Sequence, residues 1–331
     1  MLQLLARIIF WLRSGSLKLL TLAGLILLVW GTLSPVGTLI WWADEGVELL
    51  GLKSSPRVVS SNPNSTSISK SSQLNCYIIF LPGVGDFSAN QLTSGEEVFL
   101  DSLITAHPSC IAVSDVFPYS AANESLGGQR VLAPLWEFAD RAQGWLAVSN
   151  VVIKIRNLWR FAISADPRYG PIYNQGIATA IIERMNAQQP IPEKPLQIIM
   201  VGTSGGVQVA LGAVDYLKRR LEADITIISL GGVFAGTNGF TVSDRVYHLH
   251  GEFDWVENIG AIVFPSRWRW SVGSPFNQAR LQNRYAVASS GSHTHDGAEG
   301  YFGEDLVNKG VTYVGLTLQQ VNQLPIWSAK K

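Results

Sequence analysis

The chain is poor in cysteine and in charged side chains. Among its 331 residues only two are cysteines, and Asp, Glu, Lys and Arg together make up 15%. Two cysteines are too few for a disulfide-rich scaffold, and Cys76 and Cys110 lie too far apart for a C-x-x-C redox or zinc pair. Because basic and acidic residues balance at 25 each, no net charge attracts nucleic acid. We therefore expect no nucleic-acid partner.

Each cysteine stands at the start of a short apolar run that we interpret as a strand. If the two strands are parallel neighbours, both sulfurs lie at the same end of the sheet. In an oxidising compartment Cys76 and Cys110 could then form a disulfide. Cysteines without a disulfide are, however, among the residues most often buried in protein interiors. Of the two interpretations we favour two buried thiols.

Hydrophobic residues make up 47% of the chain, and one long stretch of them carries no charge. Residues 19–42 (LLTLAGLILLVWGTLSPVGTLIWW) would span about 36 Å as a helix, enough to cross a hydrocarbon core of about 30 Å. Membrane helices tolerate a proline such as Pro35. A cleaved signal peptide would have a shorter apolar region and a small-x-small cleavage site, which we do not find. We therefore predict a retained signal-anchor within residues 1–50.

Charges on either side of this stretch predict its orientation. Three basic residues precede it and three acidic residues follow it: Arg7, Arg13 and Lys18, then Asp44, Glu45 and Glu48. The basic side of a membrane helix stays in the cytoplasm. We predict a single-pass membrane protein with a cytoplasmic N-terminus, its catalytic domain on the non-cytoplasmic side and the lipid bilayer as a partner.

Residues 51–74 differ in composition from everything around them. Most of this segment (KSSPRVVSSNPNSTSISKSSQ, 53–73) is rich in Ser, Asn and Pro and has no sustained apolar period. That composition is typical of a flexible linker. We predict that a globular domain covers residues 75–331.

Within this domain, short apolar runs alternate with segments of helix length. Six runs are rich in β-branched or aromatic residues, are bounded by Gly, Pro or Ser, and are predicted strands: 76–81, 110–117, 196–201, 225–230, 245–250 and 284–288. Apolar residues at helical spacing predict helices at 172–185 and 205–221. The alternation predicts an α/β fold, a mostly parallel sheet of about six strands with helices on both faces.

About eighty residues separate the second and third predicted strands, too many for a simple crossover. They contain two further predicted helices, at 130–143 and 145–163, and the second is mostly apolar. This second helix could pack on the core. It could also form a lid over a hydrophobic cleft or a surface that dips into a bilayer. Both interpretations stay open for the helical insertion at 118–171.

The strongest local signal is a serine between a buried strand and an amphipathic helix. In residues 196–206 (LQIIMVGTSGG), Ser204 has Gly202 two positions before it and Gly206 two positions after it. A serine on so tight a turn needs a strained backbone, and the small neighbours let strand and helix approach. The helix N-terminus can offer the N–H of Gly205 to a developing oxyanion. A phosphate-binding turn is the alternative, but the G-x-G-x-x-G pattern and the P-loop lysine are missing. We predict a nucleophilic serine.

With this turn, residues 75–305 resemble the α/β-hydrolase superfamily. The antiparallel strands that usually open the family's sheet have no room here, so we expect a trimmed sheet of six strands. The segment Pro82-Gly83-Val84-Gly85 is similar to the family's H-G-x-G loop, with proline in place of histidine. This resemblance implies the N–H of Val84 as a second oxyanion donor.

The family's order of serine, acid and histidine directs the search for the other two groups. The turn 251–254 (GEFD) resembles the family's acid turn, which implies Asp254 as the acid, with Glu252 as second choice. The histidine is expected in residues 289–297 (SSGSHTHDG). We favour His295, because family members often carry it shortly before an aromatic pair such as 301–302, and we keep His293 as the alternative.

The chain contains a second H-x-H pair, His248 and His250, which share one face of a predicted strand. We expect them to pack beneath the site. With Asp254 and Asp296, the two pairs also permit a metal-hydrolase hypothesis. The spacing disagrees with the H-x-H-x-D-H pattern, because the aspartate comes one residue early and no histidine follows it. We expect no metal and no other cofactor.

The resemblance implies an esterase or lipase-like serine hydrolase that forms an acyl-enzyme on Ser204. Because the chain is anchored and its insertion is apolar, we expect a small-molecule or lipid ester with an apolar acyl group. A cluster of aromatic residues after the acid turn could line the cleft or touch the membrane: Trp255, Phe264, Trp268 and Trp270. A non-catalytic, membrane-anchored binding protein with the hydrolase fold is the second hypothesis. The sequence leaves the oligomeric state open.

Overall fold

The computed structural model describes residues 74–85, 92–119, 146–192, 196–237, 239–308 and 310–327. The predicted signal-anchor at 19–42, the linker up to residue 73 and the predicted helix at 130–143 lie outside these residues. Within the described ranges no helix combines the length and the apolar character that crossing a membrane requires.

Six strands form one parallel sheet, as predicted. They are β1 (Cys76–Leu81), β2 (Cys110–Val113), β3 (Leu196–Thr203), β4 (Ala223–Leu230), β5 (Arg245–Gly251) and β6 (Tyr285–Gly291). Their order across the sheet is β2-β1-β3-β4-β5-β6, and every neighbouring pair is parallel. The strands' carboxyl ends therefore meet at one edge, where binding sites of α/β folds lie. Two short strands near the C-terminus, β7 (Leu306–Asn308) and β8 (Val311–Thr312), form a separate antiparallel pair.

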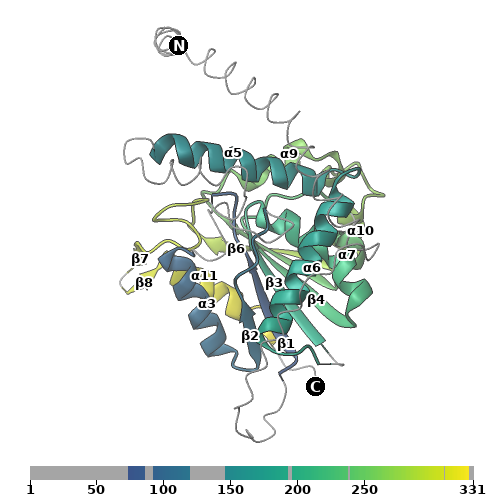
Figure 1. Ribbon diagram of the computed structural model, residues 1–331. Coiled ribbons are helices and arrows are strands. Elements are labelled where there is room, and N and C mark those ends of the chain that lie inside the picture. Colours follow the sequence, from purple (N-terminus) through teal and green to yellow (C-terminus); the bar gives the residue numbers. More distant parts are fainter. Residues whose placement is uncertain are drawn as a thin grey trace, which may run out of the picture. The chain divides into compact units, whose positions relative to one another are not determined.

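Helices cover both faces of the sheet (Figure 1). The helices α6 (Gly170–Gln188) and α7 (Gly206–Arg220) pack on one face, and α3 (Ser94–Ala106) and α11 (Tyr313–Asn322) on the other. Successive side chains of a strand point to opposite faces, and β1 follows this rule. Tyr77, Ile79 and Leu81 join the core under α6 and α7, whereas Ile78 and Phe80 join the core under α3 and α11. Shorter helices follow the later strands: α8 (Gly239–Val242), α9 (Glu257–Val263), η2 (Pro265–Arg267), α10 (Pro275–Leu281) and η3 (Pro325–Trp327).

The apolar helix predicted at 145–163 is α5 (Leu146–Ala165), which lies before β3 in the chain together with α6. Phe161 and Ile163 of α5 are buried in the core shared with α6 and α7. Leu158 is exposed on the other side of this helix. The C-terminal half of α5 thus packs on the core, and a role of this segment as a lid or as a surface that contacts a bilayer stays a prediction.

The two cysteines form a disulfide, so the preferred interpretation of two buried thiols is wrong. Strands β1 and β2 are parallel neighbours, and their register places Cys76 opposite Cys110. The bond attaches β2, an edge strand of the sheet, to β1. In the chain-entropy model, closing a loop with a sequence separation of 34 stabilises the folded state by about 4 kcal/mol.

Candidate active site

Ser204 lies on a sharp bend between β3 and α7. Its φ angle is +51°, a left-handed conformation that residues other than glycine rarely adopt. A Cβ atom on Gly206 would lie 2.2 Å from the carbonyl oxygen of Leu81, and one on Gly202 would lie 3.0 Å from Cα of Val207. Only glycine fits at position 206 without moving the backbone. The strained serine between small neighbours agrees with what the sequence predicts for this turn.

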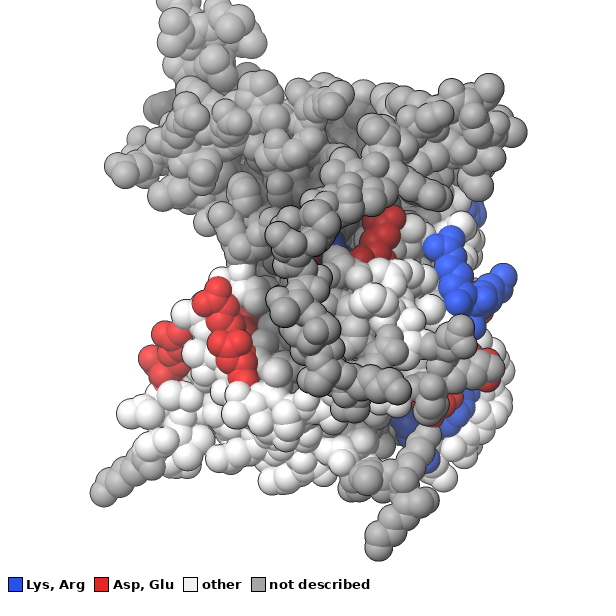
Figure 2. All heavy atoms as spheres, turned by 60° about the horizontal axis from the view of Figure 1, so that its bottom comes forward, with Lys and Arg blue, Asp and Glu red and all other residues white. Residues whose placement is uncertain are grey.

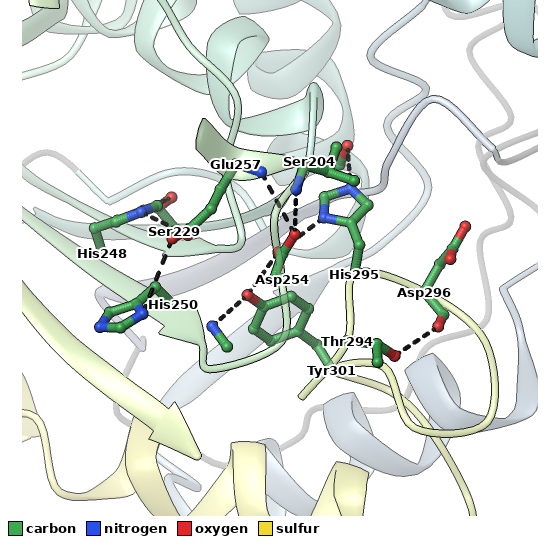
Figure 3. Close-up of polar contacts among 12 residues, drawn as sticks. Ser204, Ser229, His248, His250, Asp254, Glu257, Thr294, His295, Asp296 and Tyr301 are labelled. Carbon is green, nitrogen blue, oxygen red and sulfur yellow. Dashed lines mark hydrogen bonds and ion pairs between the residues drawn. The ribbon is translucent and has the colours of Figure 1, made fainter. Parts of the chain in front are cut away.

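His295 connects Ser204 to Asp254 (Figure 3). Nε2 of His295 lies 2.9 Å from Oγ of Ser204, and its Nδ1 lies 2.8 Å from Oδ2 of Asp254. A neutral imidazole with its proton on Nδ1 satisfies both contacts, because it donates to the carboxylate and accepts from the hydroxyl. Asp254 follows β5 and His295 follows β6, so neighbouring strands bring the two side chains to the same edge of the sheet.

Four groups donate hydrogen bonds to the buried carboxylate of Asp254. Oδ1 accepts from the N–H groups of Val256 at 2.9 Å and Glu257 at 3.4 Å. Oδ2 accepts from His295 and, at 2.9 Å, from the hydroxyl of Tyr301. Burial raises the pKa of Asp254, but the bonds from His295, Tyr301 and Val256 outweigh it and leave the pKa below its ordinary value. Asp254 is therefore held as a charged partner for His295.

His293 lies elsewhere, although it is only two residues away in the sequence. Its ring is fully buried, and Nε2 lies 3.0 Å from both the carbonyl oxygen of Tyr313 and Oγ1 of Thr317. Burial lowers the pKa of His293. Of the two histidines, the structure brings only His295 to Ser204. Glu252, the second choice for the acid, is exposed.

The loop after β1 (residues 83–85, the Val84 loop) lies against the bend at Ser204. A Cβ atom on Gly205 would lie 2.8 Å from Cγ1 of Val84, and one on Gly83 would lie 3.3 Å from Cβ of Ser204. Within the described ranges, the N–H groups of Val84 and Gly205 donate to no protein acceptor. Val84, one of the two predicted oxyanion donors, thus lies against the bend at Ser204, and Gly205, the other, directly follows that serine in the chain.

Two side chains that the sequence analysis did not select hold this loop. Asn157 of α5 donates its amide N–H to the carbonyl oxygen of Val84 at 3.0 Å, and Tyr119 donates to that of Pro82 at 3.0 Å. Asn157 is fully buried. In the sequence, the signal for this contact was a polar residue, Asn157, within the mostly apolar segment that forms α5.

A cavity of about 490 Å³ opens beside Ser204 and His295. Its walls come from the Val84 loop, the N-terminal end of α3, Lys154 of α5 and the loop 296–305. Among the described lining residues Lys154 is the one lysine, and four are acidic: Glu96, Asp296, Glu304 and Asp305. On the face shown in Figure 2, one group of acidic side chains lies apart from the basic ones, and other acidic side chains lie beside basic ones.

The aromatic residues after the acid turn are not among those that line the cavity. Trp255 and Trp270 are 70% and 74% exposed, and the rings of Trp268 and Trp270 lie 5.0 Å apart. Phe264 packs against Phe161 of α5. Within the described residues these side chains form an outer surface and a packing contact instead of the cavity wall.

A second set of serine, histidine and carboxylate lies next to the first, on β4, β5 and the start of α9 (Figure 3). Oγ of Ser229 lies 2.8 Å from Nδ1 of His248, whose Nε2 lies 3.0 Å from Oε2 of Glu257. The latter is an electrostatic contact and not an aligned hydrogen bond. His250 is farther from this carboxylate, at 3.9 Å. His248 is buried, as expected for a residue that packs beneath the site.

Within the described part of the chain, no three His, Cys, Asp or Glu side chains are grouped so that they could hold a metal ion. The chain matches no protein-family model, no curated protein and no solved structure. Its function is therefore inferred from the geometry of this site.

Proposed function

We propose that the chain is a serine hydrolase of the α/β-hydrolase type that cleaves an ester through an acyl-enzyme on Ser204. The observation that carries this proposal is the unbroken series of contacts from Ser204 through His295 to Asp254, with the serine on a strained bend at a cavity. This arrangement of nucleophile, base and orienting acid is what hydroxyl activation requires.

In the proposed reaction, His295 takes the proton of Ser204 as Oγ attacks the ester carbonyl. The negative charge that develops on the carbonyl oxygen is stabilised by the N–H groups of Val84 and Gly205. The C–O bond to the alcohol then breaks, and His295 returns its proton to the leaving alcohol. Water then attacks the acyl-enzyme while His295 takes its proton. The acyl C–O bond to Ser204 breaks, His295 returns the proton to Oγ, and the acid leaves. Asp254 stabilises the imidazolium that forms in both halves.

The substrate that we propose is an uncharged ester with an apolar acyl group. The four carboxyl-bearing residues of the cavity wall disfavour an anionic ester by like-charge repulsion. Four large apolar side chains are exposed in the segment around and after Asp254: Phe253, Trp255, Ile262 and Trp270. Aromatic and aliphatic side chains of this kind suit the interface of a membrane. Together with the uncharged stretch at 19–42, these side chains support the proposal of a membrane-bound enzyme that acts on lipid-like esters.

Covalent labelling by a fluorophosphonate tests the proposal on the full-length protein in detergent or vesicles. The reagent phosphonylates an activated serine, so we expect one labelled site in the wild type and none in Ser204→Ala. Ser229→Ala is the matched control, because Ser229 also contacts a histidine but is completely buried, and it should label like the wild type. A wild-type protein that resists the reagent would contradict the proposal.

A further inference from the structure

Asp254 shares one oxygen between two donors, and only one of them belongs to the proposed proton relay. Oδ2 accepts from His295 and also from the hydroxyl of Tyr301. We propose that Tyr301 is a positioning residue that fixes the Asp254 carboxylate for His295, and that His293 holds Tyr301 in place. This inference rests on the proposed function.

The hydroxyl of Tyr301 is bonded on both sides. It donates to Oδ2 of Asp254 at 2.9 Å and accepts from the N–H of Gly251 at 2.8 Å. Tyr301 is 1% exposed, and burial together with the neighbouring Asp254 raises the pKa of its phenol above the ordinary value. The group therefore stays protonated and remains a donor at any pH at which the enzyme works. Since Gly251 ends β5, the phenol connects the carboxylate to the sheet.

The backbone at Gly231 packs against the same contact between Asp254 and Tyr301. A Cβ atom on Gly231 would lie 2.5 Å from both Oδ2 of Asp254 and the Tyr301 ring. Gly231 has a φ angle of +54°, so any larger residue there would be strained as well as crowded. The backbone at Gly231 therefore packs directly against the Asp254–Tyr301 pair and leaves the carboxylate little room to turn.

His293 supports the Tyr301 ring from behind. The two rings are stacked, with centroids 5.2 Å apart and an interplanar angle of 6°. Nε2–H of His293 is directed to the carbonyl oxygen of Tyr313 and to Oγ1 of Thr317, and Thr317 donates in turn to the carbonyl oxygen of Tyr301 at 2.7 Å. These bonds attach Tyr301 to α11 on both its ring and its backbone. They give the first histidine of the H-x-H segment a role distinct from that of His295.

The test compares Tyr301→Phe with Tyr313→Phe in the full-length protein. Both tyrosines contact the ring of His293, but of the two only Tyr301 donates its hydroxyl to Asp254, and among the described residues the Tyr313 hydroxyl has no hydrogen-bond partner. For a neutral soluble ester, Tyr301→Phe should lower kcat about 10- to 50-fold and leave KM within about twofold, because a charge-assisted bond is lost near the reacting groups and not at the substrate. Tyr313→Phe should leave both constants within about twofold of the wild type.

A pH profile separates positioning from a general loss of folded protein. The described titratable groups that face Asp254 are His295 and Tyr301, and Glu257 lies close enough to Tyr301 to act on its charge. Removing the phenol removes a bond that favours the carboxylate, so the pKa of Asp254 rises. At low pH, where the carboxylate of the variant begins to bind a proton, kcat/KM of Tyr301→Phe should therefore fall further below that of the wild type than it does at neutral pH. His293→Gln, which keeps a donor for Tyr313 but loses the stacked ring, should show the same additional loss at low pH to a smaller extent.

Two results would overturn the inference while leaving the proposed function intact. One is a Tyr301→Phe enzyme with the kcat and pH profile of Tyr313→Phe. The other, relevant if Tyr301→Phe does not fold, is a folded His293→Gln enzyme with wild-type kcat and pH profile. Fluorophosphonate labelling of the wild type is measured first, because its absence would refute the proposed function itself and not the role of Tyr301.

Discussion

Two sets of serine, histidine and carboxylate lie next to each other in this protein, and they differ in almost everything except residue type. In the first, Ser204 occupies a left-handed bend beside a cavity. In the second, Ser229 lies inside β4 with no exposed surface. A Cβ atom on Gly232 would lie 2.2 Å from Oγ of Ser229, so no space exists there for an acyl group.

The orientation of the imidazole rings differs as well. Ser204 contacts Nε2 of His295, whereas Ser229 contacts Nδ1 of His248. Burial lowers the pKa of His248 despite the opposing effect of Glu257, so this ring is harder to protonate than an exposed histidine. Under the proposed function, residue types at hydrogen-bond distance do not by themselves make a serine a nucleophile. A strained bend and open space next to the hydroxyl are also needed, and only the first set has both.

The largest difference between the two sets is expected at their carboxylates. Asp254→Asn removes the charge that stabilises the His295 imidazolium and favours the wrong tautomer, so kcat should fall about 10³- to 10⁴-fold. Glu257→Gln changes the second set in the same way but should lower kcat less than about fivefold, because its side chain only approaches the buried His248. Steady-state hydrolysis of a soluble ester measures both. Comparable losses would mean that the two sets act together.

Substitution of one glycine beside each serine gives a smaller contrast. Gly206→Ala places a methyl group against the Leu81 carbonyl and displaces the chain that leads to Val84, so we expect about a 100-fold loss of kcat/KM. Gly232→Ala crowds Ser229 and should cost about 1–3 kcal/mol of stability, with a much smaller loss of activity per folded molecule. Thermal melting and active-site titration separate the two effects. Equal activities per folded molecule in Gly206→Ala and Gly232→Ala would contradict a catalytic role for the bend at Ser204.

The smallest expected effect concerns stability at mildly acidic pH. The pKa of His248 is lowered in the fold, so the unfolded chain binds a proton more readily, and the native state loses stability as pH falls below about 6.5. The limiting slope is about 1.4 kcal/mol per pH unit for this one proton. Glu257, Arg267 and His250 face the ring and are kept in place in His248→Gln.

Denaturant unfolding between about pH 5 and 7 should therefore show a flatter dependence for His248→Gln than for the wild type. Buried His293, whose pKa is also lowered, contributes the slope that remains. Identical slopes for variant and wild type would show that His248 binds no extra proton on unfolding.

Much of the fold could be predicted because its signals are local. Short β-branched runs separated by helical periods identified the six strands and the helices α5, α6 and α7. The bend at Ser204 was equally local, since the glycines that permit it stand at positions 202 and 206. Features that depend on register could not be decided in this way. Whether Cys76 meets Cys110 depends on which residues of β1 and β2 lie opposite each other, and the sequence does not specify this pairing.

The roles of His293 and His295 illustrate the same limit. Both histidines stand in one loop after β6, and their neighbours in sequence are nearly the same. What separates them is the direction of each ring, which depends on contacts with Tyr313, Thr317 and Tyr301. From the sequence, Tyr301 stood out only as half of an aromatic pair. Its hydrogen bond to Asp254 joins residues 47 positions apart, and local sequence patterns do not reveal contacts over such a separation.

The disulfide between Cys76 and Cys110 does more than attach an edge strand. The covalent ring that it closes contains both the Val84 loop and the start of α3, and both segments contribute to the cavity wall. Oxidation of two thiols at the far end of β1 thereby turns part of the wall of the cavity beside Ser204 from an open chain into a closed loop. A cell that produces this protein has to supply an electron acceptor for those thiols, so maturation of the cavity wall depends on the redox state of the compartment in which the chain folds.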